Sequence, residues 1–261
     1  MREFKIALDN TYMNIIEFGH GKKVLTMIAG ISLAGLEGSG EGVAAAYSAF
    51  ADEYTVYLFD RRKVVPADFS IRDMANDVYL CLKEMGITST DVYGVSQGGM
   101  IGQCLTLAHP ELVNKLVICS SMCKATPLIK EIVERWMGAA KEHDVVKMNR
   151  MFFKDVYSEA FLDAVKDMLP ELEKVGTAED CDRFQNLARP ISAFDIYDVL
   201  PEITCPVFVL GDMNDKVIGP EGSTEMAERL GCEIYLYDTY SHAVYDEAAD
   251  IKERILEFLR K

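Results

Sequence analysis

The sequence predicts an α/β fold: a mostly parallel sheet with helices on both faces and an inserted all-helical segment. Two observations carry this prediction. Apolar strand-like runs alternate with helical periodicity through residues 1–121 and again through residues 201–261. Between those two parts the chain has helical periodicity and no convincing buried strand. We therefore expect one sheet domain formed by residues 1–121 and 201–261, and a helical cap formed by residues 122–200.

The N-terminal part predicts a hairpin followed by alternating strands and helices. Residues 4–8 alternate between apolar and polar side chains, residues 13–18 form a second apolar run, and Asp9-Asn10 supplies the turn. Residues 24–29 are apolar without alternation, which is typical of a parallel strand covered on both faces. Further strands are expected at 55–59, 91–95 and 115–119, with helices at 43–50, 71–85 and from 98 to about 109. Ser70 is the expected N-cap of the second helix, with Asp73 three residues later.

Four helices are expected between the two parts of the sheet domain, with Pro127, Pro170 and Pro190 as breaks. Their expected ranges are 128–143, 145–153, 158–173 and 178–193. Strands then return at 206–210 and 233–237, with helices at 223–230 and 248–259. The helical segment leaves from the carboxyl end of a strand, which is the edge where open α/β sheets bind ligands. We therefore expect it to act as a lid.

The motif Gly94-Val95-Ser96-Gln97-Gly98 lies at a strand-to-helix junction. So sharp a turn leaves no room for a Cβ two residues before or after the serine, which explains both glycines. The turn lifts Ser96 Oγ clear of the backbone and leaves the Gln97 N–H at a helix start, where negative charge is favoured. An ordinary nucleotide-binding turn is the alternative, but the glycine spacing does not fit the phosphate-loop pattern.

Composition excludes several classes of function. The net charge of −15 and the pI near 4.7 argue against a nucleic-acid partner, which needs clustered Lys and Arg. The N-terminus opens no apolar signal region, and the most apolar stretch, residues 24–36, is too short and glycine-rich to span a membrane, so we expect a cytoplasmic protein. The seven cysteines include no C-x-x-C pair, so we interpret them as reduced, small apolar residues without a metal or catalytic role.

Three segments together resemble the α/β-hydrolases with a helical cap. Residues 94–99 match the nucleophile elbow, residues 211–218 look like the loop that carries the acid, and residues 241–246 resemble the histidine loop before the final helix. The chain order Ser…Asp…His is also that of this family, whereas chymotrypsin-like and subtilisin-like enzymes use other orders. The chain departs from the family pattern after the third strand, where Ala29-Gly30 replaces His-Gly, and after Asp60-Arg61-Arg62, where the usual glycines are missing.

Ser96, His242 and an aspartate are the candidate catalytic triad. A serine needs an adjacent base, and a carboxylate must hold the imidazole in the correct tautomer. Asp212 and Asp215 share one loop; we favour Asp215, because the acid must lie beyond the strand end and curve toward the histidine. Of the four histidines, only His242 follows a late strand and precedes the final helix.

The oxyanion hole needs two backbone N–H groups. Gln97 is expected to supply one and Ile31, just after Gly30, the other. No metal or organic cofactor is implied. In the helical cap, residues such as Trp136 and Phe152 could either line an apolar pocket or only pack the helices together.

The sequence therefore predicts a serine hydrolase that transfers the acyl group of a small, partly apolar ester, thioester or amide to water. C–C bond hydrolysis and cofactor-free perhydrolysis remain alternatives within the fold. A catalytically silent small-molecule receptor on the same scaffold is the alternative from another class. The bond cleaved and the oligomeric state stay open.

Overall fold

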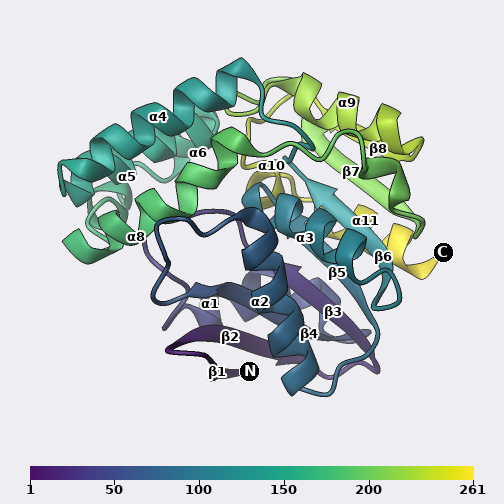
Figure 1. Cartoon of the computed structure of the whole chain (residues 1–261). Coiled ribbons are helices and arrows are strands. Elements are labelled where there is room, and N and C mark those ends of the chain that lie inside the picture. Colours follow the sequence, from purple (N-terminus) through teal and green to yellow (C-terminus); the bar gives the residue numbers. More distant parts are fainter.

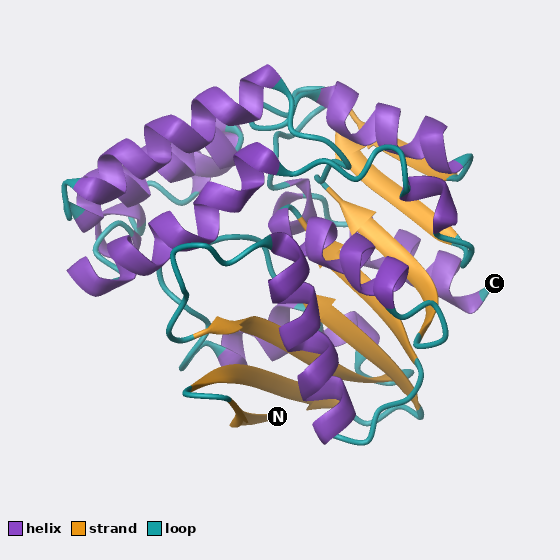
Figure 2. Ribbon diagram, in the orientation of Figure 1, coloured by secondary structure: helices purple, strands orange, loops and turns teal.

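The computed structural model describes all residues from Met1 to Lys261, and an eight-stranded sheet lies at its centre (Figures 1 and 2). The strands are β1 Arg2–Leu8, β2 Thr11–Gly19, β3 Lys23–Ile28, β4 Tyr54–Arg62, β5 Thr90–Val95, β6 Val113–Cys119, β7 Val207–Asp212 and β8 Glu233–Tyr237. They lie in the order β1-β2-β4-β3-β5-β6-β7-β8. Only β1 with β2 and β2 with β4 pair antiparallel. The predicted mostly parallel α/β sheet is confirmed.

Two hydrophobic clusters, one on each face of the sheet, explain why the central strands lack polar alternation. Every residue of β5 and β7 is buried. Neighbouring side chains of one strand enter different clusters: Val92 packs in one and Tyr93 in the other. The edge strand β8 is the contrast, because Glu233 and Ile234 are exposed there. The interior positions are thus those that need apolar residues on both faces.

Helices cover both faces of the sheet (Figure 2). Residues of α2 (Ile71–Glu84), α3 (Gln97–Ala108) and α9 (Pro220–Leu230) pack in the larger cluster. The other face is covered by α1 (Gly40–Ala46), the 3₁₀ turn η1 (Ser48–Phe50), α10 (Val244–Glu247) and α11 (Ile251–Arg260). The capping prediction for α2 is confirmed: the Asp73 N–H donates to Ser70 Oγ, and the Ser70 N–H donates to the Asp73 carboxylate.

Only helices occur between β6 and β7. They are α4 Pro127–Lys141, α5 Val145–Val156, α6 Glu159–Ala164, α7 Leu169–Leu172 and α8 Ala178–Ala188, followed by the 3₁₀ turns η2 Arg189–Ala193 and η3 Leu200–Glu202. The chain leaves and re-enters the sheet side by side, since Lys124 and Asp195 form an antiparallel bridge. The division into a core and a cap stays a prediction.

Two of the helices predicted between β6 and β7 are interrupted in the structure. The expected helix 158–173 is two short helices, because Pro170 has no N–H for a continuing helix and fits only the first turn of a new one. The expected helix 178–193 stops at Ala188, and Pro190 begins a 3₁₀ turn instead. Each proline thus lies in the first turn of a new element.

Hydrogen bonds attach the helical segment to the core beside α5 and α6 and beside α8. Beside α5 and α6, the Ala243 N–H donates to Val156 O and Ser158 Oγ donates to the Glu247 carboxylate. Beside α8, the Gln97 amide donates to Leu187 O. The teal and green helices thus lie next to the carboxyl ends of the central strands (Figure 1).

All seven cysteines are free thiols, in agreement with the interpretation of reduced residues. None of the helices combines the length and the apolar character that crossing a bilayer requires.

Candidate active site

Ser96 lies between the last residue of β5 and the first residue of α3, with φ 51° and ψ −121°. A positive φ is rare for a residue with a side chain and is held here by the packing around the turn. A Cβ on Gly94 would overlap Gly98 O, and a Cβ on Gly98 would overlap Ile28 O. Both glycines are therefore required, as the elbow motif predicts.

The structure brings Ser96 and His242 together. His242 Nε2 lies 2.9 Å from Ser96 Oγ, although 146 positions separate the two residues. The imidazole is 2 % exposed, whereas Ser96 is half-buried. The other three histidines contact other groups: His20 lies near Asp52, His109 stacks on Tyr79, and His143 pairs with Asp182.

Asp215 is the carboxylate beside the imidazole. Its Oδ2 and Oδ1 lie 2.8 and 3.1 Å from His242 Nδ1. An ionised carboxylate only accepts, so Nδ1 carries the proton and Nε2 is free to accept from the Ser96 hydroxyl. The Val217 and Ile218 N–H groups donate to Asp215 Oδ1 at 2.8 and 3.0 Å and fix its orientation. The apolar pair after the aspartate thus supplies its backbone donors.

Asp212, the alternative acid, has a different set of partners. Its Oδ1 accepts from the Asn214 N–H at 2.7 Å and its Oδ2 accepts from the Tyr240 N–H at 2.9 Å. The residue is 1 % exposed and ends β7. Asp212 therefore connects the loop that carries Asp215 to the loop that carries His242. Its structural role was not foreseen from the sequence.

The two predicted oxyanion donors lie on either side of the serine. Gln97 is the first residue of α3, so its N–H has no partner within the helix. The loop after β3 passes close to the serine on the other side: a Cβ on Gly30 would lie 3.4 Å from Ser96 Cβ. Ile31 follows in that loop and is 8 % exposed. The donor roles of Gln97 and Ile31 remain predictions.

The buried Arg61 connects the start of α3 with the loop after β3. Arg61 Nη2 donates to Ala29 O at 2.5 Å, and Arg61 Nε donates to Gln97 Oε1 at 3.2 Å. Burial lowers the pKa of the guanidinium to about 10, so it remains cationic at neutral pH. In the sequence Arg61 occupies the variable position of the Asp-x-Arg pattern formed by residues 60–62. Its contacts depend on the fold and could not be found from the pattern.

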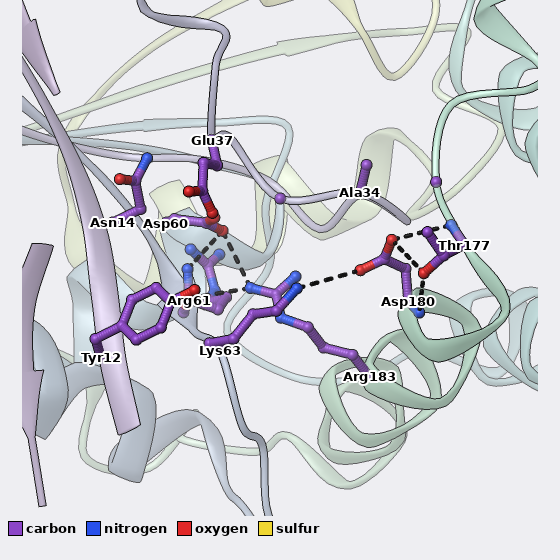
Figure 3. A pocket seen from close by; sticks show the side chains of 12 residues that line it. Tyr12, Asn14, Ala34, Glu37, Asp60, Arg61, Lys63, Thr177, Asp180 and Arg183 are labelled. Atoms are coloured by element: carbon purple, nitrogen blue, oxygen red, sulfur yellow. Dashed lines mark hydrogen bonds and ion pairs between the residues drawn. The ribbon is translucent and has the colours of Figure 1, made fainter. Parts of the chain in front are cut away.

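Arg61 also lines a polar cavity of about 290 Å³ between β2, β4 and α8 (Figure 3). Each acid of the cavity has a basic partner: Arg183 pairs with Asp60, Lys63 with Asp180, and Lys5 with Glu37. Figure 3 shows Arg183 reaching from α8 toward Asp60 and Arg61.

A second, largely apolar cavity of about 310 Å³ is lined by residues adjacent to Ser96 in sequence or space, although Ser96 itself is not part of its lining. Gly30, Ile31 and Val95 form its wall next to Ser96, and Phe152 and Phe153 of α5 form another wall. Of the two aromatic residues considered above as pocket candidates, Phe152 lines the cavity. Trp136 instead packs between Phe152 and Phe184.

Tyr93 places a polar group in the wall of this apolar cavity. The residue is 1 % exposed and its hydroxyl has no hydrogen-bond partner. Burial raises the pKa of this phenol well above its usual range. Tyr93 is therefore a neutral hydroxyl without a protein partner at neutral pH.

The family model of the alpha/beta hydrolase fold matches residues 31–249. The chain belongs to this family. A protein of Rhizobium rhizogenes named "Putative carbamate hydrolase RutD" is 30% identical over 244 residues, which cover 87% of this chain and 90% of the relative. A relative of the same name from Agrobacterium fabrum is 28% identical over 239 residues, 85% of this chain and 90% of its own.

Solved structures give the same fold for this α/β-hydrolase. The enol-lactonase from Burkholderia xenovorans superposes with a TM-score of 0.87 at 16% identity, covering 99% of this chain and 100% of its own. The hydrolase MGS-M2 from a deep-sea metagenome library gives a TM-score of 0.87 at 17% identity, covering 99% of this chain and 98% of its own. The protein is an enzyme of the hydrolase class that acts on small substrates.

Proposed function

We propose that the protein is a serine hydrolase in which Ser96 is the nucleophile, His242 the general base and Asp215 the acid of the triad. The observation that carries this proposal is the unbroken chain of contacts from Ser96 Oγ through His242 to the Asp215 carboxylate. The arrangement lies at the junction of a parallel strand and a helix, where this fold exposes its nucleophile.

Acylation follows from the direction of these hydrogen bonds. Ser96 Oγ attacks the substrate carbonyl while His242 Nε2 takes the hydroxyl proton, and the Asp215 carboxylate stabilises the resulting imidazolium. The negative charge that forms on the carbonyl oxygen is met by the backbone N–H groups of Gln97 and Ile31. His242 then gives its proton to the leaving group as the bond to the carbonyl carbon breaks.

Water completes the cycle by the same steps. His242 takes a proton from water, the hydroxide attacks the acyl carbon, and the tetrahedral intermediate collapses with Ser96 Oγ as the leaving group. The proton returns from His242 to Ser96, and the free acid leaves. No proton donor beyond the triad is needed.

The cavity beside the serine favours a small, partly apolar substrate. Its volume of about 310 Å³ is at the lower end of small-molecule pockets, and most of its lining side chains are apolar. Esters, thioesters and amides of short acyl groups fit this description. Carbamates join the candidate substrates because the curated relatives carry that name.

Labelling of Ser96 with a fluorophosphonate tests the mechanism directly. The wild-type protein should react at Ser96, and the Ser96→Ala variant should fold normally, remain unlabelled and lose about 10⁴-fold or more in kcat. A turnover screen over esters, thioesters, amides and carbamates of increasing acyl length then identifies the bond. Absence of labelling, or activity of Ser96→Ala within tenfold of wild type, would reject the serine mechanism and favour the silent receptor or another chemistry.

A further inference from the structure

Arg61 is a buried cation without an ionic partner. Its neighbours in space and sequence are paired: Arg62 with Asp77 of α2, and Arg183 with Asp60. Arg61 forms no salt bridge, although it is only 5 % exposed. Burying a charge without a salt bridge is costly, so the neutral groups that Arg61 contacts and the charge of nearby Asp60 together compensate for it.

Both of those contacts lie on the two segments that carry the predicted oxyanion donors, next to the donor N–H groups and not on them. Ala29, whose carbonyl accepts from Arg61 Nη2, begins the loop that continues through Gly30 to Ile31. Gln97, whose side-chain oxygen accepts from Arg61 Nε, supplies the other predicted N–H from its backbone. One planar guanidinium thus spans the two segments that must be held at a fixed separation.

A β-bulge puts Arg61 in this position. Met13 pairs with Arg62 and Ile15 pairs with Phe59, so two residues of β4, Asp60 and Arg61, face the single residue Asn14. The additional residue locally alters the alternation of β4, and the side chain of Arg61 lies buried beneath the elbow.

The helical segment also contacts Arg61 and its partner Gln97. Arg183 of α8 donates to Arg61 O at 3.0 Å, and the Gln97 side chain that accepts from Arg61 donates to Leu187 O at 2.6 Å. Arg183 and Arg61 approach each other from α8 and β4 in Figure 3. The position of Arg61 is therefore fixed by both the core and the helical segment.

We propose that Arg61 is a positioning residue that holds the two donors of the oxyanion hole in register and places a positive charge behind the developing oxyanion. The inference rests on the serine-hydrolase function proposed above. Arg61 touches Ala29 and Gln97 and not the reacting atoms, so it acts through the donor positions. Its contribution belongs to the transition state, where the carbonyl oxygen carries negative charge.

Three variants separate this role from a purely structural one: Arg61→Met, Arg61→Lys and, as the matched control, Arg62→Met. The control removes an adjacent arginine of the same strand whose carboxylate partner lies on α2 and not at the elbow. Each variant is measured for melting temperature, for kcat and KM on the best ester from the screen, and for affinity toward a trifluoromethyl ketone with the same acyl group.

Arg61→Met should lower kcat by about 10²–10³-fold, as loss of oxyanion stabilisation does, and leave KM within about threefold. Affinity for the ketone, which forms a tetrahedral adduct with serine, should fall in parallel with kcat. Arg61→Lys should recover part of the loss, because it keeps the charge without the planar fork. Arg62→Met should lower the melting temperature and keep kcat within about threefold of wild type.

A kcat of Arg61→Met within threefold of wild type, or equal kcat losses in Arg61→Met and Arg62→Met, would overturn the proposal. If Arg61→Met does not fold, Arg61→Lys decides. A tenfold loss of kcat with unchanged KM would support the positioning role of the guanidinium. A kcat at the wild-type value would show that the planar fork is not needed and would overturn that role. Failure of the serine mechanism itself is recognised separately, because then wild-type Ser96 is not labelled.

Discussion

Asp212 and Asp215 show how two carboxylates three positions apart take different tasks. Asp215 faces the imidazole, and Asp212 receives two backbone N–H groups that join the acid and histidine loops. The sequence favoured Asp215 because it lies further along the loop. Nothing in the sequence revealed what Asp212 binds, since its second partner, the Tyr240 N–H, comes from a distant segment.

Substitution of each aspartate by asparagine should therefore give two distinct defects. Asp215→Asn should keep the fold but favour the wrong tautomer of His242, with a loss of up to about 10⁴-fold in kcat. Asp212→Asn sets an amide NH₂ against a backbone N–H, so it should destabilise the fold by about 1–3 kcal/mol and lower kcat less than Asp215→Asn does. Urea unfolding and steady-state kinetics on both variants check the two effects, and the reverse order in kcat would make Asp212 the acid.

At Tyr93 we expect a substitution that preserves or raises the stability of the fold. The buried group has no hydrogen-bond partner, so Tyr93→Phe removes an unsatisfied polar atom and leaves the ring in place. We expect the variant to be as stable as wild type or more stable, by up to about 1–3 kcal/mol. Chemical denaturation measures the difference. A clear loss of stability would mean that the hydroxyl has a partner, such as an ordered water molecule.

At the scale of elements, the first residue of a helix was predicted from the sequence more reliably than the last one. The capping box of α2 was readable from Ser70 and Asp73, because a cap is a contact between near neighbours in the chain. In the helical segment Pro170 and Pro190 were recognised as breaks, but the ranges expected from periodicity ran past them. In the structure each proline lies in the first turn of a new element. The β-bulge at Arg61 was invisible, because it is a property of the pairing between β2 and β4.

The cap of α2 can be tested on its own. Ser70→Ala removes the side-chain acceptor of the Asp73 N–H, and we expect a loss of about 1 kcal/mol in the free energy of unfolding with unchanged kcat. Ser48→Ala is the control, since Ser48 is exposed and starts a 3₁₀ turn without a side-chain cap. Equal stability of the two variants would contradict the contribution of the capping box.

At the scale of the whole molecule, alternation of strands and helices was enough to predict the sheet, because buried parallel strands need apolar residues on both faces. The candidate triad could be predicted because the fold restricts its members to particular strand ends. The cavity walls could not be predicted: Phe152 and Trp136 look equivalent in the sequence, and only packing puts the first at the cavity and the second between helices.

The free thiols give a prediction for the whole chain. Since no disulfide closes a loop, stability comes from the core and not from restriction of the unfolded state. The melting temperature and kcat should therefore be the same with and without a reducing agent. A decrease of the melting temperature on reduction would indicate a disulfide between thiols that are free here.

The contact between Ser96 and His242 spans 146 positions, and it has a consequence for how the protein is made. A ribosome completes the elbow, the centre of the sheet and every helix between β6 and β7 before it adds His242, the base of the proposed mechanism. A nascent chain interrupted before residue 242 thus holds a serine with no group to take its proton. During in vitro translation, covalent labelling of Ser96 would therefore count only finished chains whose last strand and helix have docked, and the intensity of one gel band would follow the yield of native protein over time.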